Sequence, residues 1–125
     1  MLTLGAASSG FPLDPCGGNL VSNLNRSSDN DRSNALFIEK LAYMTADEDL
    51  FIAQLRSREE AYGDDYPYAC NPENTPGHYN SNSFAMGLLK VVGLPNPQTP
   101  FRAPPAYIQS VYPGLLTPLP ASAFQ

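Results

Sequence analysis

The chain has 125 residues, 13 of them proline, and its 12 acidic and 7 basic side chains give a formal net charge of −5. This length predicts one domain with a modest core, and the negative charge disfavours nucleic acid or an anionic membrane as a partner. One histidine and two cysteines exclude an intrachain zinc site of four cysteines, or of two cysteines and two histidines, and nothing in the sequence predicts another metal or a cofactor.

The first part of the chain predicts short strands joined by turns. Residues 1–4 have the pattern of a strand that ends where Gly5 follows. Residues 17–22 predict a turn that leads into a second short strand. The polar run 23–34 is rich in Asn, Asp and Ser, whose side chains form local hydrogen bonds, and therefore predicts a loop.

Three segments have the apolar spacing of helices. The first covers residues 35–44 and follows polar capping residues. The second begins at Thr45 with a capping-box pattern, and we expect it to end near Ala61 because Gly63 follows. The third covers residues 80–92, where apolar residues recur every three to four positions before a glycine.

The remaining segments predict loops and an ordered tail. Residues 63–79 predict a loop with a short extended piece at 66–69. The last 31 residues carry 8 prolines but are too apolar to stay in water. We therefore expect an α+β fold of one small domain, with about three helices, a few short strands and an extended Pro-rich tail (95–125) packed on a core (1–94). A Pro-rich segment that docks a partner is the alternative.

The two cysteines leave the redox state open. A disulfide between Cys16 and Cys70 would stabilise the fold by about 4 kcal/mol, and two reduced thiols fit the sequence equally well. Cys70 is a poor nucleophile candidate, because the neighbouring Asp64 and Asp65 would raise the pKa of its thiol.

The sequence gives no clear location for the protein. Residues 1–12 lack a basic start and a long apolar run, so we expect no signal peptide within this chain. Secretion with a separate leader and release from a larger exported polypeptide both remain open. The apolar stretches are far shorter than the roughly 18 residues that predict a membrane-spanning helix.

One local motif could carry chemistry. Residues 78–84, with the sequence His-Tyr-Asn-Ser-Asn-Ser-Phe, come directly before an apolar helix. The free N–H groups at a helix start stabilise an anionic nucleophile or a developing oxyanion. We therefore consider Ser81 as a nucleophile and His78 as a weak candidate base. The simpler interpretation is a helix cap, because Asn and Ser are preferred capping residues.

The same motif resembles the nucleophile helix of the permuted papain-like hydrolases, a superfamily of amidase-type peptidases and acyltransferases. Their helix begins with Asn-Cys, and an aromatic residue follows three positions after the cysteine. On this chain Asn80 matches the asparagine, Ser81 takes the cysteine position and Phe84 matches the aromatic residue. The resemblance implies that Asn82 and Ser83 help Asn80 to bind a substrate or to order the helix start.

A wider similarity is to uncharacterised bacterial domains that carry the motif Tyr-Asn-Ser-Asn-Ser-Tyr/Phe, some at the ends of large toxin-like polypeptides. In those domains a Thr-Leu-Gly-Ala segment and an Asn-Arg-x-x-Asp loop precede the motif, as residues 3–6 and 25–29 do here. The ending of this chain, residues 113–124, also resembles their tails.

The chain departs from the papain-like pattern at two points. Ser81 stands where the enzymes have cysteine, and serine is a weak nucleophile without a base. The enzymes hold their histidine on a strand upstream of the nucleophile helix, and this sequence has no upstream histidine. His78 precedes Ser81 by only three residues, and its default interpretation is a surface histidine.

Three functions follow from these observations. The favoured one is a non-catalytic or degenerate papain-like domain that serves as a binding or structural module. The second is a hydrolase or acyltransferase that acts on an amide or ester bond through Ser81. The third is a small secreted protein that docks a partner through its tail. The partner would be an unidentified protein or a peptide-like substrate, and the sequence does not determine the oligomeric state.

Overall fold

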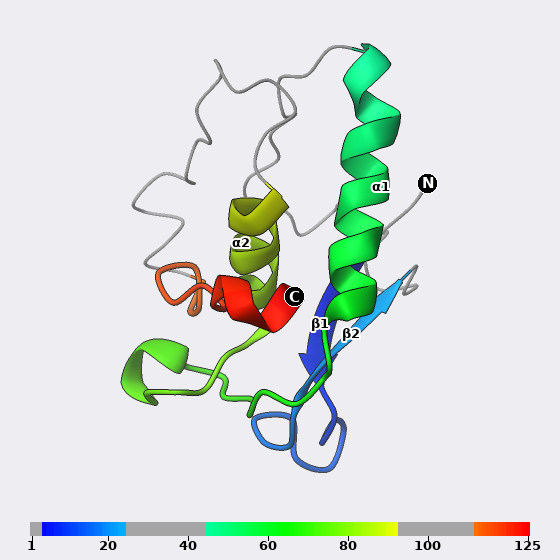
Figure 1. The fold of residues 1–125 in the computed structure, drawn as a ribbon. Helices are drawn as coiled ribbons and strands as arrows, with labels where there is room; N and C mark the ends of the chain where they lie inside the picture. Colours follow the sequence, from blue (N-terminus) through cyan, green and yellow to red (C-terminus); the bar gives the residue numbers. More distant parts are fainter. Residues whose placement is uncertain (1–3, 25–44, 93–111) are drawn as a thin grey trace.

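The computed structural model describes residues 4–24, 45–92 and 112–125. These residues form a two-stranded sheet and two α-helices, together with two short 3-10 helices (Figure 1). In chain order the elements are β1 (Leu4–Ser8), β2 (Leu20–Leu24), α1 (Thr45–Ala61), η2 (Pro72–Asn74), α2 (Ser81–Val92) and η3 (Ala121–Phe124).

This arrangement agrees with the predicted α+β class. About three helices were expected, and the described residues contain two α-helices. The helix predicted at 35–44 lies outside the described residues, and so does the part of the predicted tail from 95 to 111.

The two strands form an antiparallel hairpin whose position differs from the prediction. Leu4 pairs with Leu24 and Ser8 pairs with Leu20, so the sheet runs through Gly5 and does not end there. The prediction was wrong because glycine weakens a strand locally, whereas the partner strand decides whether the ladder continues. For the same reason β2 extends to Leu24, beyond the expected start of the polar loop at residue 23.

Helix α1 ends at Ala61, as the glycine at position 63 predicted. Its apolar face contains Phe51 and Leu55, and Tyr62 follows directly after the helix. Tyr62 is buried, and its hydroxyl donates a 2.6 Å hydrogen bond to the carbonyl oxygen of Leu20. This bond ties the end of α1 to the start of β2.

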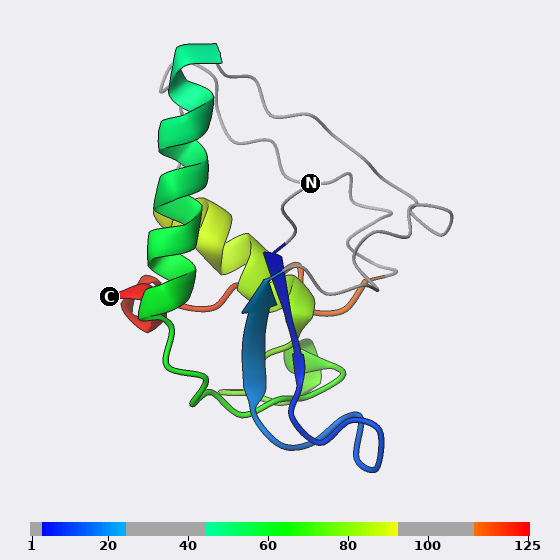
Figure 2. The same ribbon diagram turned by 90° about the vertical axis from the view of Figure 1, so that its right-hand side faces the viewer.

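Helix α2 is the central element of the described fold. It contacts β1, α1 and η3, and Figure 2 shows it crossing behind the hairpin with α1 beside it. Its buried residues therefore extend around much of its surface: Ser83, Phe84, Met86, Gly87 and Leu88. A Cβ atom at Gly87 would overlap the carbonyl oxygen of Leu119, so only glycine permits this close approach.

The centre of the core is a cluster of three aromatic rings from distant parts of the chain. The ring centroids of Tyr62 and Phe84 are 5.3 Å apart, and Phe124 lies 5.9 Å from the first and 5.5 Å from the second. Because Leu119 and Phe124 are almost fully buried, the segment 112–125 contributes side chains to the core.

The loop between the two α-helices is held in an extended form at 66–69, close to the prediction. Tyr68 forms a parallel bridge with Tyr79, and Pro67 forms an antiparallel bridge with Asn19. This segment therefore lies between the end of the β1–β2 loop and the residues that lead into α2.

Candidate functional site

Asn80 caps the start of α2. Its side-chain Oδ1 accepts hydrogen bonds from the N–H groups of Asn82 (3.0 Å) and Ser83 (3.1 Å). Its carbonyl oxygen accepts the N–H of Phe84 at 3.0 Å. The N–H groups of the three residues after Ser81 are therefore all bonded to Asn80, which is the arrangement of a complete N-cap.

The side chains at the helix start also bind residues 113–114. The side-chain amides of Asn80 and Asn82 donate to the carbonyl oxygen of Pro113, at 2.8 and 2.9 Å. The hydroxyl of Ser83 lies 3.3 Å from the carbonyl oxygen of Gly114 and 3.3 Å from Oδ1 of Asn80. Asn80 and Ser83 are 5 % and 0 % exposed, so these bonds satisfy buried polar groups.

Gly114 fits against this cap because it has no side chain. Its φ of +98° lies in a region that favours glycine, and a Cβ atom would overlap Oδ1 of Asn80. The N–H of Gly114 donates a 2.7 Å hydrogen bond to Oε1 of Glu73, which lies in η2. We call Asn80, Asn82, Ser83, Pro113 and Gly114 the cap cluster.

The structure does not bring the two candidate catalytic residues together. Ser81 is the first residue of α2 and is partly exposed. The Nδ1 atom of His78 lies 3.3 Å from the carbonyl oxygen of Pro76, and within the described residues no hydrogen bond joins its ring to Ser81. A general base must lie within about 3.2 Å of the group that it deprotonates, or reach it through a water molecule.

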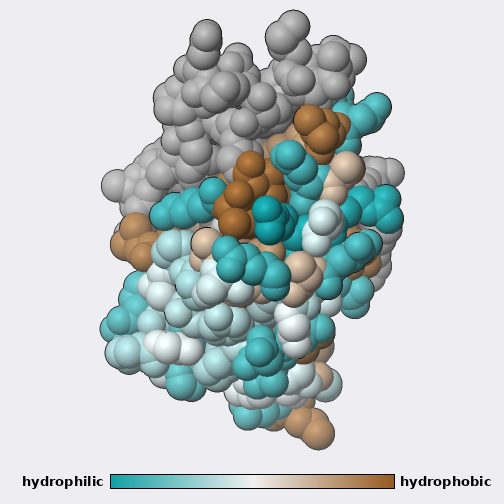
Figure 3. Space-filling view, in the orientation of Figure 1, coloured by the Kyte–Doolittle hydropathy of each residue, from teal (hydrophilic) through white to brown (hydrophobic). Residues whose placement is uncertain are grey.

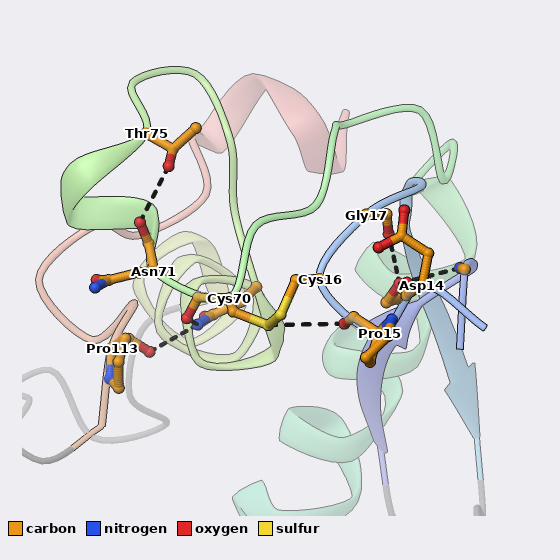
Figure 4. Close-up of a disulfide and its surroundings, with 11 residues drawn as sticks. Asp14, Pro15, Cys16, Gly17, Cys70, Asn71, Thr75 and Pro113 are labelled. Carbon is orange, nitrogen blue, oxygen red and sulfur yellow. Dashed lines mark hydrogen bonds between the residues drawn. A yellow bond between two sulfur atoms is a disulfide. The ribbon is translucent and has the colours of Figure 1, made fainter. Parts of the chain in front are cut away.

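Cys16 and Cys70 form a disulfide, with their Cα atoms 4.9 Å apart (Figure 4). The bond links the β1–β2 loop to the segment before η2. The side-chain amide of Asn80 lies between this segment and Pro113. The side-chain amide of Asn80 also lies 3.4 Å from the carbonyl oxygen of Cys70. The disulfide is therefore adjacent to the cap cluster, and neither cysteine is available as a thiol nucleophile.

Two tyrosines of the described fold have raised pKa values. Burial, together with the negative charges of Asp64 and Asp65, raises the pKa of Tyr62 far above its ordinary value of 10.0. Burial also raises the pKa of Tyr68. Both shifts favour the neutral phenol, so neither group is suited to act as a base near neutral pH.

The described residues contain no group of three or more His, Cys, Asp or Glu side chains that could hold a metal ion. A hollow of about 470 Å³ lies between α1, α2 and β1, and it is lined by Leu4, Glu48, Ile52, Leu55, Ala85, Leu88 and Leu89. The hollow includes neither Ser81 nor His78. Its lining offers one carboxylate and otherwise apolar side chains, which provides no catalytic pair.

Three partners of the motif were not predicted from the sequence: Glu73, Pro113 and Gly114. The Pro-Gly pair at 113–114 is a typical turn signal. A turn signal does not show which distant side chains will bind its carbonyl groups, so the pairing with α2 is visible only in the structure.

Comparisons with known proteins give no independent identification. A scan against family models finds no match, and searches of the curated proteins and of the solved structures find none either. The resemblance to the permuted papain-like superfamily therefore stays a prediction from the motif around Ser81.

Proposed function

We propose that this chain is a non-catalytic binding or structural module that has kept a papain-like helix start without its chemistry. The observation that carries the proposal is the use of the helix-start N–H groups. Oδ1 of Asn80 binds the N–H groups of Asn82 and Ser83, which would otherwise be free donors for an oxyanion at the helix start. These donors stabilise the fold and cannot at the same time stabilise a transition state.

The surroundings of Ser81 support the same conclusion. A serine hydroxyl becomes nucleophilic only when a base takes its proton. The ring of His78 contacts the carbonyl oxygen of Pro76. The sequence contains no other histidine that could act as the base. The side chains that the resemblance assigns to substrate binding, Asn80, Asn82 and Ser83, all contact the chain's own segment at 113–114.

The test is a comparison of covalent labelling and turnover. Wild type, Ser81→Ala and the control Ser57→Ala, which removes an exposed serine of α1, are incubated with a fluorophosphonate probe. The same three proteins are assayed with ester substrates and with peptidoglycan. We expect no labelling and no turnover with any of the three.

The second candidate function, a hydrolase or acyltransferase, is favoured by one observation. Ser81 is partly exposed at the first position of α2, where the helix dipole would stabilise an anion. Labelling that disappears in Ser81→Ala and persists in Ser57→Ala would establish this candidate and overturn the non-catalytic proposal.

The disulfide favours a place outside the reducing cytosol, because disulfides persist in secreted and exported proteins. This agrees with a module that is secreted or released from a larger exported polypeptide. A disulfide that stays intact in protein isolated from the culture medium, measured by mass spectrometry without added oxidant, is the expected result.

The third candidate, docking through a free Pro-rich tail, has less support. Residues 112–125 bury Leu119, Ala123 and Phe124, and Arg58 donates a 3.2 Å hydrogen bond to the carbonyl oxygen of Phe124. We expect deletion of residues 100–125 to unfold the domain, measured by circular dichroism. A truncated domain that stays folded and loses a partner would favour tail docking.

A further inference from the structure

The chain contains one Asp-Pro peptide bond, between Asp14 and Pro15 in the loop that joins β1 to β2. The loop forms the lower end of the molecule in Figure 1, and Figure 3 shows the surface tapering towards the same end. Both residues are exposed, so water reaches the bond directly. An Asp-Pro bond is the peptide bond that a carboxyl group breaks most easily, because the aspartate side chain can close a five-membered ring on its own carbonyl carbon.

The fold fixes the backbone of Asp14 on both sides. Its N–H donates to the carbonyl oxygen of Gly10 at 2.7 Å, and its own carbonyl oxygen accepts the N–H of Gly17 at 3.2 Å. Just after the Asp-Pro bond, the disulfide from Cys16 to Cys70 attaches the loop to the rest of the fold. The bond is therefore held in one geometry, whereas the same bond in an unfolded chain is free to rotate.

Two glycines leave room for the two reacting groups of Asp14. A Cβ atom at Gly17 would overlap Oδ2 of the carboxylate, and a Cβ atom at Gly10 would overlap the carbonyl oxygen. Figure 4 shows the carboxylate next to Gly17. Both groups therefore lie close against the loop backbone, and a side-chain atom at position 17 would displace the carboxylate. Proximity of this kind replaces an encounter between separate molecules.

The carbonyl oxygen of Asp14 has donors for the negative charge that develops on it when its carbon is attacked. The N–H of Gly17 donates to this oxygen, and Oγ of Ser8 lies 3.3 Å from it. The hydroxyl of Ser8 also contacts the carbonyl oxygen of Gly17, and its single hydrogen can turn to the oxygen of Asp14 as charge grows there. Two donors around one carbonyl oxygen are the arrangement that stabilises an oxyanion.

From this geometry we propose that the chain cleaves its own backbone between Asp14 and Pro15. An oxygen of the Asp14 carboxyl group bonds to the carbonyl carbon of the same residue, and the bond from that carbon to the nitrogen of Pro15 breaks. The proton of the carboxyl group passes to this nitrogen, which has no hydrogen in the peptide and leaves as a secondary amine. Water then opens the cyclic anhydride and leaves two carboxyl groups on Asp14. One water molecule is consumed, and nothing is oxidised or reduced.

The product is a nicked domain whose two pieces stay together. The piece 15–125 keeps the disulfide, because Cys16 and Cys70 both follow the cut. The piece 1–14 keeps β1, which pairs with β2 along its whole length and buries Ala6. The proposal goes beyond the binding role proposed above and does not involve the start of α2, since one cut in its own chain is not turnover of a substrate.

The test is an incubation of the folded protein in buffer of about pH 5, in which carboxyl groups are partly protonated, with protease inhibitors present. Native mass spectrometry should show the mass of the whole chain plus one water molecule. Denaturing mass spectrometry without reductant should show the separate pieces 1–14 and 15–125. We expect the folded protein to be cleaved about tenfold faster than the same protein unfolded in urea, because only the fold supplies the donors.

Three variants test the chemistry of the cut. Asp14→Asn removes the carboxyl group that attacks, and Pro15→Ala removes the proline leaving group. We expect each to lower the rate of cleavage to that of an ordinary peptide bond. Asp65→Asn removes another exposed carboxylate and is the matched control, which should be cleaved as wild type is.

Three further variants test the positioning. Gly17→Ala displaces the carboxylate of Asp14 and should slow cleavage about tenfold. Gly63→Ala is the matched control, because the nearest atom to its Cβ position is 3.5 Å away, and it should leave the rate unchanged. Ser8→Ala removes the second donor and should slow cleavage about threefold or more. Circular dichroism checks that each variant is folded.

Three outcomes would overturn the proposal. The first is a folded protein that stays intact. The second is an equal rate in the folded and the urea-unfolded protein, because the cut would then reflect the ordinary lability of an Asp-Pro bond. The third is cleavage of Asp14→Asn at the rate of wild type, which would identify a contaminating protease. None of these outcomes depends on Ser81, so the non-catalytic proposal stands or falls separately with the labelling experiment.

Discussion

The cap cluster and the tip of the β1–β2 loop reverse the usual distribution of side chains. We call Phe11, Pro12 and Leu13 at this tip the apolar tip. At the cap cluster, Asn80 and Ser83 are buried, and each has hydrogen-bond partners within the fold. At the apolar tip, Phe11 and Leu13 are exposed on a fixed loop. A buried polar group costs free energy unless it is fully bonded, and an exposed apolar group contributes little to folding. The comparison therefore assigns a large contribution to stability to the first region and a small one to the second.

The disulfide connects the two regions, and its loss has the largest expected effect. The bond spans a separation of 54 residues, and closing such a loop stabilises a fold by about 4 kcal/mol. We expect the double variant Cys16→Ser/Cys70→Ser to lose this amount in urea unfolding. Adding a reductant should destabilise the wild type to the same extent and leave the double variant unchanged. Equal stability of wild type and double variant would show that the bond does not hold the regions together.

Removing the cap should have the next largest effect. Asn80→Ala removes the acceptor of two N–H groups and a donor to Pro113. We expect a loss of about 3 kcal/mol, because a cap and a buried hydrogen-bond network are lost together. Asn82→Ala removes one side-chain bond to Pro113 and should cost about 1 kcal/mol. Urea unfolding measures both, and similar losses for the two variants would contradict the central role of Asn80.

The fit of Gly114 against the cap gives a sharper test. Gly114→Ala introduces a Cβ atom that overlaps Oδ1 of Asn80, in a backbone region that disfavours side chains. We expect a loss of about 2 kcal/mol, made up of strain and a displaced cap. Gly77→Ala is the matched control, because its φ is also positive (+80°) but no atom lies within 4 Å of its Cβ position. It should cost about 1 kcal/mol, and an equal cost at both sites would mean that the cap tolerates the methyl group.

A smaller effect is expected at the buried phenol of Tyr62. Tyr62→Phe removes the hydrogen bond to Leu20 and should cost about 1 kcal/mol at neutral pH. Because folding raises the pKa of Tyr62, its contribution is complete below about pH 10 and is lost as the pH rises further. The stability of wild type should therefore fall more steeply above pH 10 than that of Tyr62→Phe. Parallel pH profiles in urea unfolding would contradict this assignment.

The smallest effect on stability is expected at the apolar tip. Leu13→Ser should change the free energy of unfolding by less than about 0.5 kcal/mol, because the side chain is 98 % exposed. A loss of stability comparable to that of Asn80→Ala would break the comparison, since the tip would then be part of the packed fold.

Local signals predicted the helices of the described fold well. The glycine at position 63 marked the end of α1, and the polar run at 80–83 marked the start of α2. Helix boundaries depend on residues within one turn, so a short stretch of sequence contains the information. The strand β1 was predicted less well, because its pairing with β2 decides its extent and Gly5 alone does not.

The candidate site was predicted only in part. The motif around Ser81 correctly directed attention to a helix start, and capping was one of its two interpretations. The partners of the cap lie 31 to 33 positions later in the chain, and no local pattern shows such a pairing. The disulfide could not be chosen over two free thiols, since spacing does not reveal whether two Cα atoms approach each other.

The seating of residues 113–124 on α2 has a consequence for synthesis on the ribosome. The N–H of Leu119 donates to the carbonyl oxygen of Ser83 at 2.9 Å, and Phe124 fills the aromatic cluster. Domains fold during synthesis as their residues emerge. Helix α2 can pack on β1 and α1, which precede it in the chain, but its contacts with η3 form only after the segment 113–124 has emerged. The side of Phe84 that Phe124 covers therefore stays exposed on the nascent chain until the segment 113–124 has left the exit tunnel.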